Sequence, residues 1–269
     1  MIVQHNITSM NANRQLGIVG GNLAKATEKL SSGYRINRAA DDAAGLAISE
    51  KMRSQVRGLN RASDNAQDGI SLIQTAEGAL DQKHAILQRT RELVVQASNT
   101  AVLDSGTADV QKIQDEIDKL KEEYNRIDTD TEFNKKTLLD GKYTGYLQVG
   151  ANEGQGYTLQ IGATTWEEVT LDQKDGQANS EFITKIDDKI TEVSTLRSQL
   201  GAQQNKLEYT IKVDDNTAEN MQSAESRIRD TDMADEMTRF SKESILQQAA
   251  TSMLAQANQA NQGVLSLLQ

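Results

Sequence analysis

Apolar residues recur in alternating steps of three and four near the start of the chain, which is the spacing of a heptad seam on an α-helix. The seam consists of Leu16, Val19, Leu23, Ala26 and Leu30. It stops before Gly33, a residue type that readily adopts the left-handed conformation that closes a helix. Residues 16–30 are therefore predicted to form a helix that needs a partner along its seam.

A much longer apolar stripe follows, from Asp41-Asp42 to about Asn99. Acidic residues suit a helix N-terminus, where carboxylates accept hydrogen bonds from free N–H groups. A helix rises about 1.5 Å per residue, so this one would be roughly 85 Å long. The stripe residues are Met52, Val56, Leu59, Ala66, Ile70, Ile73, Leu80, Leu87 and Val94. Its length predicts an elongated helical arrangement, because a small globule has no core of that length.

The middle of the chain changes character twice. Helical spacing from Val110 to Ile127 predicts a shorter third helix, and it returns from Ile186 to Ile228. Between Thr131 and about Asp175, apolar and polar residues alternate among glycines and threonines, which predicts short strands and turns. The predicted fold class is mostly α: a long antiparallel helical rod or coiled-coil bundle with a small β-hairpin subdomain.

The final stretch, residues 244–269, carries no charge and contains a second heptad seam. This seam consists of Leu246, Ala250, Met253, Ala257, Ala260, Val264 and Leu267. The matching seam is the one at 16–30, so the two terminal helices are expected to pair with each other. Because two helices make a poor core, the pair is expected to need further copies of itself. The eight Gln and Asn side chains of this stretch would be costly in lipid, so no membrane span is predicted.

Composition and charge narrow the function further. Aromatic residues make up 4% of the chain and proline is absent, which favours helices packed on small and aliphatic side chains. The net charge is −10, although residues 1–63 hold nine Lys/Arg against four Asp/Glu. An acidic body disfavours nucleic acid as a partner. The absence of cysteine excludes disulfides and thiolate metal sites.

The sequence contains no recognisable catalytic chemistry. His5 and His84 are far apart along the predicted rod and are interpreted as solvated or interface residues. The glycines of 150–156 lack the Lys-Ser/Thr that a phosphate-binding loop needs, and the acidic residues of 128–132 lack the glycine of a calcium loop. We therefore predict no catalytic residues, no cofactor and no metal, and thus no enzyme.

Three segments resemble bacterial flagellins. Residues 30–80 (LSSGYRINRAADDAAG and onward) resemble the N-terminal core of that family, and residues 227–268 resemble its C-terminal core. The run LQVGANEGQ at 147–155 resembles the short β segment that joins the two cores. The resemblance implies a structural subunit that polymerises into the filament used for motility. One departure is Asn261, which stands where the family commonly has proline.

The resemblance also implies a domain organisation. Residues 1–40 with 230–269 would form D0, the terminal helices of the inner filament core. Residues 41–229 would form D1, a helical rod that includes the β segment of about 131–175. The region 140–180 is too short to hold the outer domains of larger flagellins, so a short form is expected.

Several partners follow from the resemblance alone. They are further copies of the chain, an export chaperone at the C-terminal segment, and the cap and junction proteins of the flagellum. The expected location is the extracellular filament, reached without a cleaved signal peptide, since the N-terminus lacks the apolar region of one.

The stretch LQRTRELVVQ, residues 87–96, resembles the surface that Toll-like receptor 5 reads on flagellins. By that resemblance Gln88, Arg89 and Leu93 occupy recognised positions, and Glu116 the supporting acidic position. An arginine beside an exposed leucine would combine charge with an apolar anchor. The alternative is that these residues serve only subunit packing.

Two other functions stay open at this point. A hook–filament junction protein shares terminal helices with flagellins, but the intact C-terminal run and the compact middle disfavour it. An adhesin or receptor-binding module is disfavoured because the sequence shows no aromatic-rich pocket.

Overall fold

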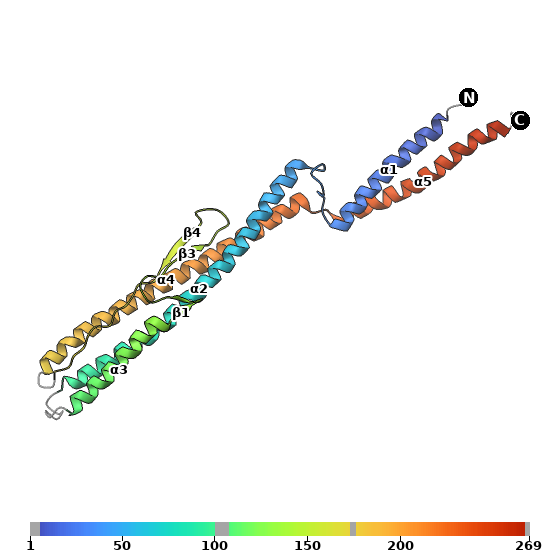
Figure 1. The fold of residues 1–269 in the computed structure, drawn as a ribbon. Coiled ribbons are helices and arrows are strands. Elements are labelled where there is room, and N and C mark those ends of the chain that lie inside the picture. The colour runs from blue at the N-terminus through green and yellow to red at the C-terminus, as the bar shows by residue number, and fades with distance from the viewer. Residues whose placement is uncertain (1–5, 100–107, 173–175, 267–269) are drawn as a thin grey trace. The chain divides into compact units, whose positions relative to one another are not determined.

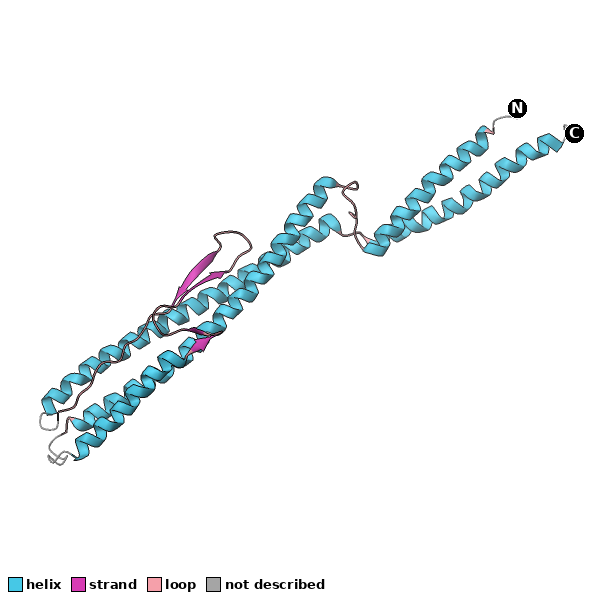
Figure 2. Ribbon diagram, viewed as in Figure 1, coloured by secondary structure: helices cyan, strands magenta, loops and turns pink. Residues whose placement is uncertain are grey.

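The computed structural model describes residues 6–99, 108–172 and 176–266, with side chains given for all of these except 108 and 260–266. The chain forms two compact units, residues 1–54 with 219–269 (unit 1) and residues 55–218 (unit 2). Its helices and short strand pairs confirm the predicted mostly α fold (Figures 1 and 2). In chain order they are α1 (Ile7–Ser32), α2 (Ala43–Ala97), α3 (Ala108–Asp130), β1 (Glu132–Phe133), β2 (Lys136–Thr137), β3 (Thr144–Gln148), β4 (Gly156–Gln160), α4 (Gly176–Arg229) and α5 (Met233–Ser266).

The ends of the first two helices lie where the sequence places them. Gly33 follows α1 with φ of 75°, and its N–H donates to the carbonyl of Lys29. A side chain at this position would be strained, which explains the glycine. Asp42 precedes α2, and its Oδ1 accepts a hydrogen bond of 2.8 Å from the N–H of Gly45. Asp42 is therefore a helix cap, as its sequence context predicts.

The connection between α1 and α2 is held by backbone contacts within unit 1. The N–H of Arg35 donates to the carbonyl of Arg229 over 2.7 Å, and the N–H of Thr231 donates to that of Gly33 over 3.0 Å. The Tyr34 ring lies 4.7 Å from the Arg229 guanidinium. The two short breaks in the helices, before α2 and before α5, are thus tied together.

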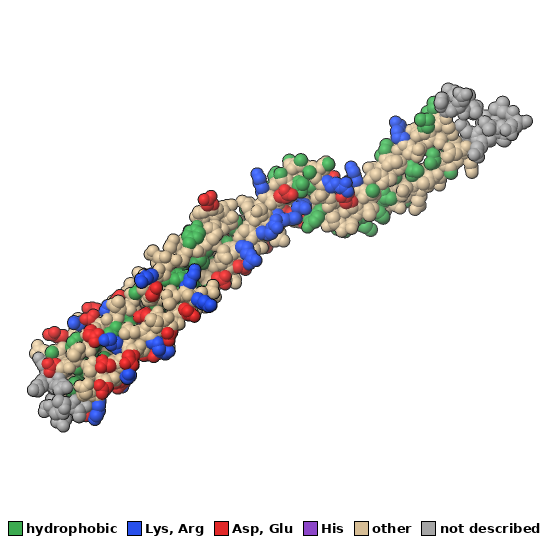
Figure 3. All heavy atoms as spheres, in the orientation of Figure 1, with side chains coloured by type: hydrophobic (Ala, Val, Ile, Leu, Met, Phe, Trp, Pro, Cys, Tyr) green, Lys and Arg blue, Asp and Glu red, His purple; other side chains and the backbone are tan. Residues whose placement is uncertain are grey.

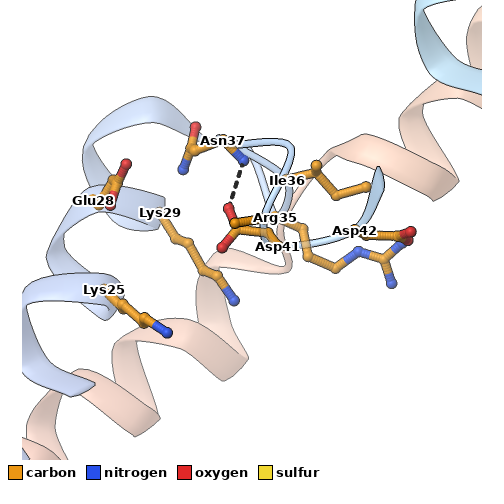
Figure 4. Close-up of a pocket in the computed structure, with 9 residues that line it drawn as sticks. Lys25, Glu28, Lys29, Arg35, Ile36, Asn37, Asp41 and Asp42 are labelled. Carbon is orange, nitrogen blue, oxygen red and sulfur yellow. Dashed lines mark hydrogen bonds between the residues drawn. The ribbon is translucent and has the colours of Figure 1, made fainter. Parts of the chain in front are cut away.

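Asp41 organises the same connection (Figure 4). Its carboxylate accepts the N–H groups of Arg38 and Asn37 at 3.0 and 3.2 Å. These bonds, with help from Lys25 and Lys29 of α1, hold the pKa of Asp41 below its ordinary value. The hollow of about 410 Å³ around these residues is lined by opposite charges that face one another.

Unit 2 has its core where α2, α3, α4 and the strand pairs meet. One cluster contains Leu80 and Leu87 of α2, Tyr124 of α3 and Leu200 and Leu207 of α4. A second cluster joins the last turns of α2 to the first turns of α3 and to Ile186 of α4. Heptad-spaced apolar residues thus bury against neighbouring helices, as the stripe on residues 52–94 predicts.

The strands form two separate antiparallel pairs, drawn in magenta in Figure 2. β1 and β2 are joined by Asn134 and Lys135, which both have positive φ. Such a two-residue turn matches the natural twist of a hairpin. β3 and β4 pair over five residues each, and the Asn65 side chain of α2 donates to the carbonyl of Gln148 at 3.0 Å. This is the small β subdomain that alternation in 131–175 predicts.

The compact units divide within α2 and α4, at Ser54 and at Glu219. The breaks between helices lie instead at residues 33–42 and 230–232, close to the predicted limits of D0 and D1. The D0 and D1 assignment therefore stays a prediction.

Candidate assembly and receptor surfaces

The terminal helices α1 and α5 lie side by side and run in opposite directions (Figure 1). The Asn6 side chain donates to the carbonyl of Ala257 at 3.0 Å, and the Ser9 hydroxyl donates to the side chain of Asn258 at 2.6 Å. Asn6 also accepts the N–H of Ser9 and caps α1. The helices containing the two predicted seams thus pair with each other.

The α1–α5 pair buries very few of its own side chains. Across residues 7–32 and 233–259, where side chains are described, only Ala26 and Glu236 are buried. The α1 seam residues Leu16, Val19, Leu23 and Leu30 are only half-buried. Since apolar burial is the main stabilising contribution, α1 and α5 contribute little core of their own.

Within the described residues of the chain, only part of the predicted α5 seam is covered, and its role in assembly stays a prediction. Ala250 and Ala257 are half-buried, but Leu246 and Met253 are exposed, by 41% and 62%. Gln247 and Leu254, one position further along, are half-buried instead. Two neighbouring sides of α5 therefore have heptad spacing. The side with Gln247 and Leu254 is half-buried, whereas the side with the larger apolar residues Leu246 and Met253 is exposed.

The remainder of that seam lies at the end of α5. The side chains of Ala260 and Val264 are outside the described part, and Leu267 lies beyond the described residues. The helical backbone continues through Asn261 to Ser266. Asparagine retains the N–H that proline would remove from a helix, which is compatible with this continuity.

The terminal helices expose apolar side chains that no described residue of the chain covers. On α1, Ile7, Met10 and Ile18 recur at helical spacing and form a stripe of their own. On α5 the exposed apolar residues are Met233, Met237, Ile245, Leu246 and Met253. Figure 3 shows apolar side chains along both helices on the visible face, with few charges between them. We call these eight residues the terminal apolar faces.

A second candidate surface lies on unit 2, where Arg89 of α2 faces Glu116 of α3. The Arg89 Nε and Nη2 atoms donate to Glu116 Oε1 at 3.0 and 2.9 Å, and Nη1 donates to Glu92 at 3.2 Å. The hydrogen bond with Glu116, followed by that with Glu92, raises the pKa of Arg89. Gln88 is exposed beside it, with its amide nitrogen 2.9 Å from His84 Nε2. The structure thus brings Gln88, Arg89 and Glu116 together at the surface.

Leu93 does not join that surface, so the expectation that it is exposed is wrong. It is 2% exposed and packs with Val94, Val110 and Ile117 in the second core cluster. A residue four positions after Arg89 is rotated around the helix towards α3, and here that rotation places it in the core. The exposed apolar residue of this segment is Val95.

Comparison with known proteins identifies the family. Residues 3–144 match the bacterial flagellin N-terminal helical region, and residues 183–268 match the bacterial flagellin C-terminal helical region. The chain belongs to the bacterial flagellin family. It is 54% identical to a flagellin of Halalkalibacterium halodurans and 48% identical to a flagellin of Bacillus subtilis, in both cases over the full length of both chains. A crystal structure of Bacillus cereus flagellin matches 56% of this chain and 88% of that chain, at 29% identity and a TM-score of 0.50.

This flagellin is a structural subunit of the flagellar filament and not an enzyme, as its family membership shows. Within the described residues, no cluster of His, Asp or Glu has the geometry to hold a metal ion. In the same part of the chain, no helix is both long and apolar enough to cross a membrane.

Sequence reasoning on this flagellin missed six of the eight residues of the terminal apolar faces, all except Leu246 and Met253. Ile7, Met10 and Ile18 form a second apolar stripe on α1, in addition to the seam that the heptad spacing predicts. A search for two stripes on the same helix would have found them, because a helix surrounded by partners is apolar on more than one side.

Proposed function

We propose that the terminal apolar faces are the surfaces through which copies of this flagellin pack into the filament. The observation that carries the proposal is the near absence of buried residues between α1 and α5, together with the eight exposed apolar side chains on the same helices. A second copy is the favoured occupant because flagellins polymerise into filaments. Burial of these side chains would then supply the stability that the isolated pair lacks.

Seeded polymerisation of purified subunits tests this proposal. Ile245→Gln is expected to raise the critical concentration, the free-subunit concentration left at equilibrium with filaments, by about tenfold. The reason is that burying one large apolar side chain contributes on the order of 1.5–3 kcal/mol. Deletion of 244–269 should abolish polymerisation altogether.

The matched control is Val95→Gln, which makes the same kind of change at an exposed apolar residue of unit 2. It should leave the critical concentration near that of the parent. Normal filaments from the deleted chain, or equal effects of the two glutamine variants, would contradict the assignment of the contacts to the terminal helices.

We further propose that the free subunit is recognised by Toll-like receptor 5 through Gln88, Arg89 and Glu116. Arg89 is 51% exposed at its side chain while fixed by Glu116, so it presents a preorganised cation at low entropic cost. Leu93 would support this surface from beneath, by packing α2 against α3, and would not contact the receptor in the conformation described.

A receptor reporter assay with monomeric protein tests this second proposal. Arg89→Ala is expected to lower the potency at least tenfold, because hot-spot arginines commonly contribute about 2 kcal/mol or more. Arg91→Ala is the matched control: Arg91 is also exposed, but it pairs with Asp187 of α4 at 2.7 Å. Equal potency of the two variants would contradict the proposal.

We propose the remaining partners from family membership alone. The uncharged segment 244–269 would be held by an export chaperone before assembly, and the filament ends would meet the cap and junction proteins. The filament would lie outside the cell after export without a cleaved signal peptide. Co-purification of a chaperone with the full chain, and its loss from the chain lacking 244–269, would support the first of these.

A further inference from the structure

Methionine is concentrated on the exposed sides of the terminal helices. The described residues include six of the chain's seven methionines, and four of the six are strongly exposed. These are Met10, Met253, Met237 and Met233, exposed by 67%, 62%, 51% and 48%. The other two, Met52 and Met221, are half-buried on α2 and α4. All four exposed sulfurs therefore lie on the terminal apolar faces.

We propose that Met10, Met233, Met237 and Met253 are sites of reversible oxidation that prevent the free subunit from polymerising and that become protected once the filament forms. The inference rests on the proposed function, because it requires the terminal apolar faces to be the contacts between copies. It goes further by assigning these side chains a chemical sensitivity that depends on the state of assembly.

The chemistry needs only a two-electron oxidant such as hydrogen peroxide. A lone pair on the thioether sulfur attacks one peroxide oxygen, the O–O bond breaks, and the sulfur gains that oxygen as a sulfoxide. The peroxide is reduced and leaves as water. Methionine sulfoxide reductases reverse the change: two thiols are oxidised to a disulfide, the thioether is restored and the oxygen leaves as water. The chain has no cysteine, so methionine is its only sulfur available for oxidation.

The consequence for assembly follows from the surroundings of these sulfurs. Met10 lies in the α1 stripe between Ile7 and Ile18, and Met253 follows Leu246 at a spacing of seven residues on α5. A sulfoxide oxygen is a strong hydrogen-bond acceptor, and removing it from water against apolar side chains without a donor is unfavourable. Oxidised faces would therefore remain hydrated and would bind a second copy weakly.

Protection follows from the same contacts. In the free subunit the sulfurs are open to solvent, and methionine oxidation increases with exposure. In a filament held together by these faces, neighbouring copies would cover the sulfurs. The subunit would thus be sensitive before assembly and resistant after it.

Peptide mass spectrometry after peroxide treatment tests the protection. Free subunits and preformed filaments receive the same dose, and each methionine peptide is scored for the mass of one added oxygen atom. The four exposed methionines should oxidise several-fold faster in free subunits than in filaments. Met52 and Met221 serve as internal references, because they are half-buried before assembly begins. Equal rates at the four sites in both states would overturn the proposal.

Polymerisation of oxidised subunits tests the block. Peroxide-treated subunits should show a critical concentration raised about tenfold or more, since each lost apolar contact costs of the order of a factor of ten in an equilibrium constant. Treatment with a sulfoxide reductase should return it to the untreated value. A variant with all four residues changed to Leu should have the same critical concentration before and after peroxide, whatever its untreated value, whereas Met52→Leu with Met221→Leu should stay sensitive.

The outcomes separate the two proposals. Oxidised parent chains that polymerise at the untreated critical concentration would overturn the methionine inference and leave the assembly proposal intact. If the block persists after the reductase has restored every methionine, the oxidation of these sulfurs is not its cause. Failure of the assembly proposal would instead appear in untreated protein, as indifference to Ile245→Gln.

Discussion

At the scale of single residues, the surroundings of Tyr124 change its acidity strongly. Its side chain is completely buried in unit 2, with the Lys83 ammonium 4.2 Å from the ring centre and the Trp166 ring edge-on at 5.2 Å. Burial raises the pKa of Tyr124 to about 12, because a phenolate would lose its hydration there.

This shift makes stability depend on pH in the alkaline range. The pKa of Tyr124 is higher in the folded state than the value of about 10 in an unfolded chain, so its contribution to stability is complete below pH 10 and is lost between about pH 10 and 12. Tyr124→Phe should therefore reduce the loss of unfolding free energy over that interval by up to about 2 kcal/mol.

Denaturant unfolding at a series of pH values measures this difference. Tyr146→Phe is the control, because it removes the same hydroxyl group from a side chain that is 62% exposed in the folded chain. An alkaline decline that is the same in Tyr124→Phe and in the parent would show that Tyr124 is not its source.

At the scale of elements, an ion pair between the buried Lys83 and the half-buried Asp128 joins α2 to α3. The Lys83 ammonium is inaccessible to solvent; it donates to Asp128 Oδ1 and, at 3.0 Å, to the hydroxyl of Thr164. Burial lowers the pKa of Lys83 and raises that of Asp128, and hydrogen bonding between them opposes both shifts. The pair therefore specifies how the helices meet more than it stabilises them.

Replacing Lys83 alone should lower the free energy of unfolding, whereas replacing both Lys83 and Asp128 should lower it much less. Lys83→Met leaves the half-buried Asp128 carboxylate without its partner and is expected to lower the free energy of unfolding by about 1–3 kcal/mol. Lys83→Met combined with Asp128→Leu should recover most of that loss, because apolar side chains of similar volume can replace a buried pair.

Calorimetry or denaturant unfolding of the three proteins provides the measurement. Lys119→Met, which breaks an exposed pair with Glu122 within α3, is the control and should change the stability by less than about 1 kcal/mol. A double variant less stable than Lys83→Met would contradict this account.

The sequence predicts where these helices begin and end more readily than it predicts which side of each helix is buried. The limits of α2 follow from Asp42 and from an unbroken stripe, since caps and helical periodicity are local properties. The register of α5 does not follow, because Gln247 and Leu254 are covered while Leu246 and Met253 are not. Which of two stripes is covered depends on the partner helix, which a local pattern does not contain.

The same limit applies to single residues of the candidate site. Arg89 and Glu116 could be paired from their resemblance to known flagellins, and they do meet. The motif alone predicts an exposed Leu93, because a short stretch of sequence does not contain α3 and α4, whose packing buries this residue. No pattern in the sequence predicts that Lys83 is buried, because a lysine on a helix is ordinarily exposed to solvent.

At the scale of the whole molecule, the net charge is carried by one of the two units. Unit 1 holds eleven basic and eleven acidic residues, so unit 2 carries the entire net charge of −10. Figure 3 shows acidic and basic side chains crowded over α3 and the neighbouring ends of α2 and α4. Copies that meet through unit 1 would avoid a general repulsion that their second units retain.

Assembly should therefore respond to salt. Raising the ionic strength from about 0.01 to 0.15 M shortens the Debye length from about 30 to about 8 Å and screens the repulsion between acidic units. We expect seeded growth, followed by light scattering, to become roughly several-fold faster over this range.

A partly neutralised variant provides the comparison. Glu181→Gln with Asp188→Asn removes two exposed charges from α4, and its growth rate should depend less steeply on salt. Growth that slows as salt is added would show that attraction between opposite charges, and not repulsion, controls the approach of subunits.

The sparse contact between α1 and α5 makes the terminal helices subject to mass action. With Ala26 and Glu236 as the only buried residues within 7–32 and 233–259, the stability of these helices would increase with each neighbouring copy that packs against them. Dilution would then act on these helices as a denaturant does, while unit 2, with two core clusters of its own, would not respond. A subunit that leaves the filament would lose the helical structure of α1 and α5, while unit 2 would stay folded.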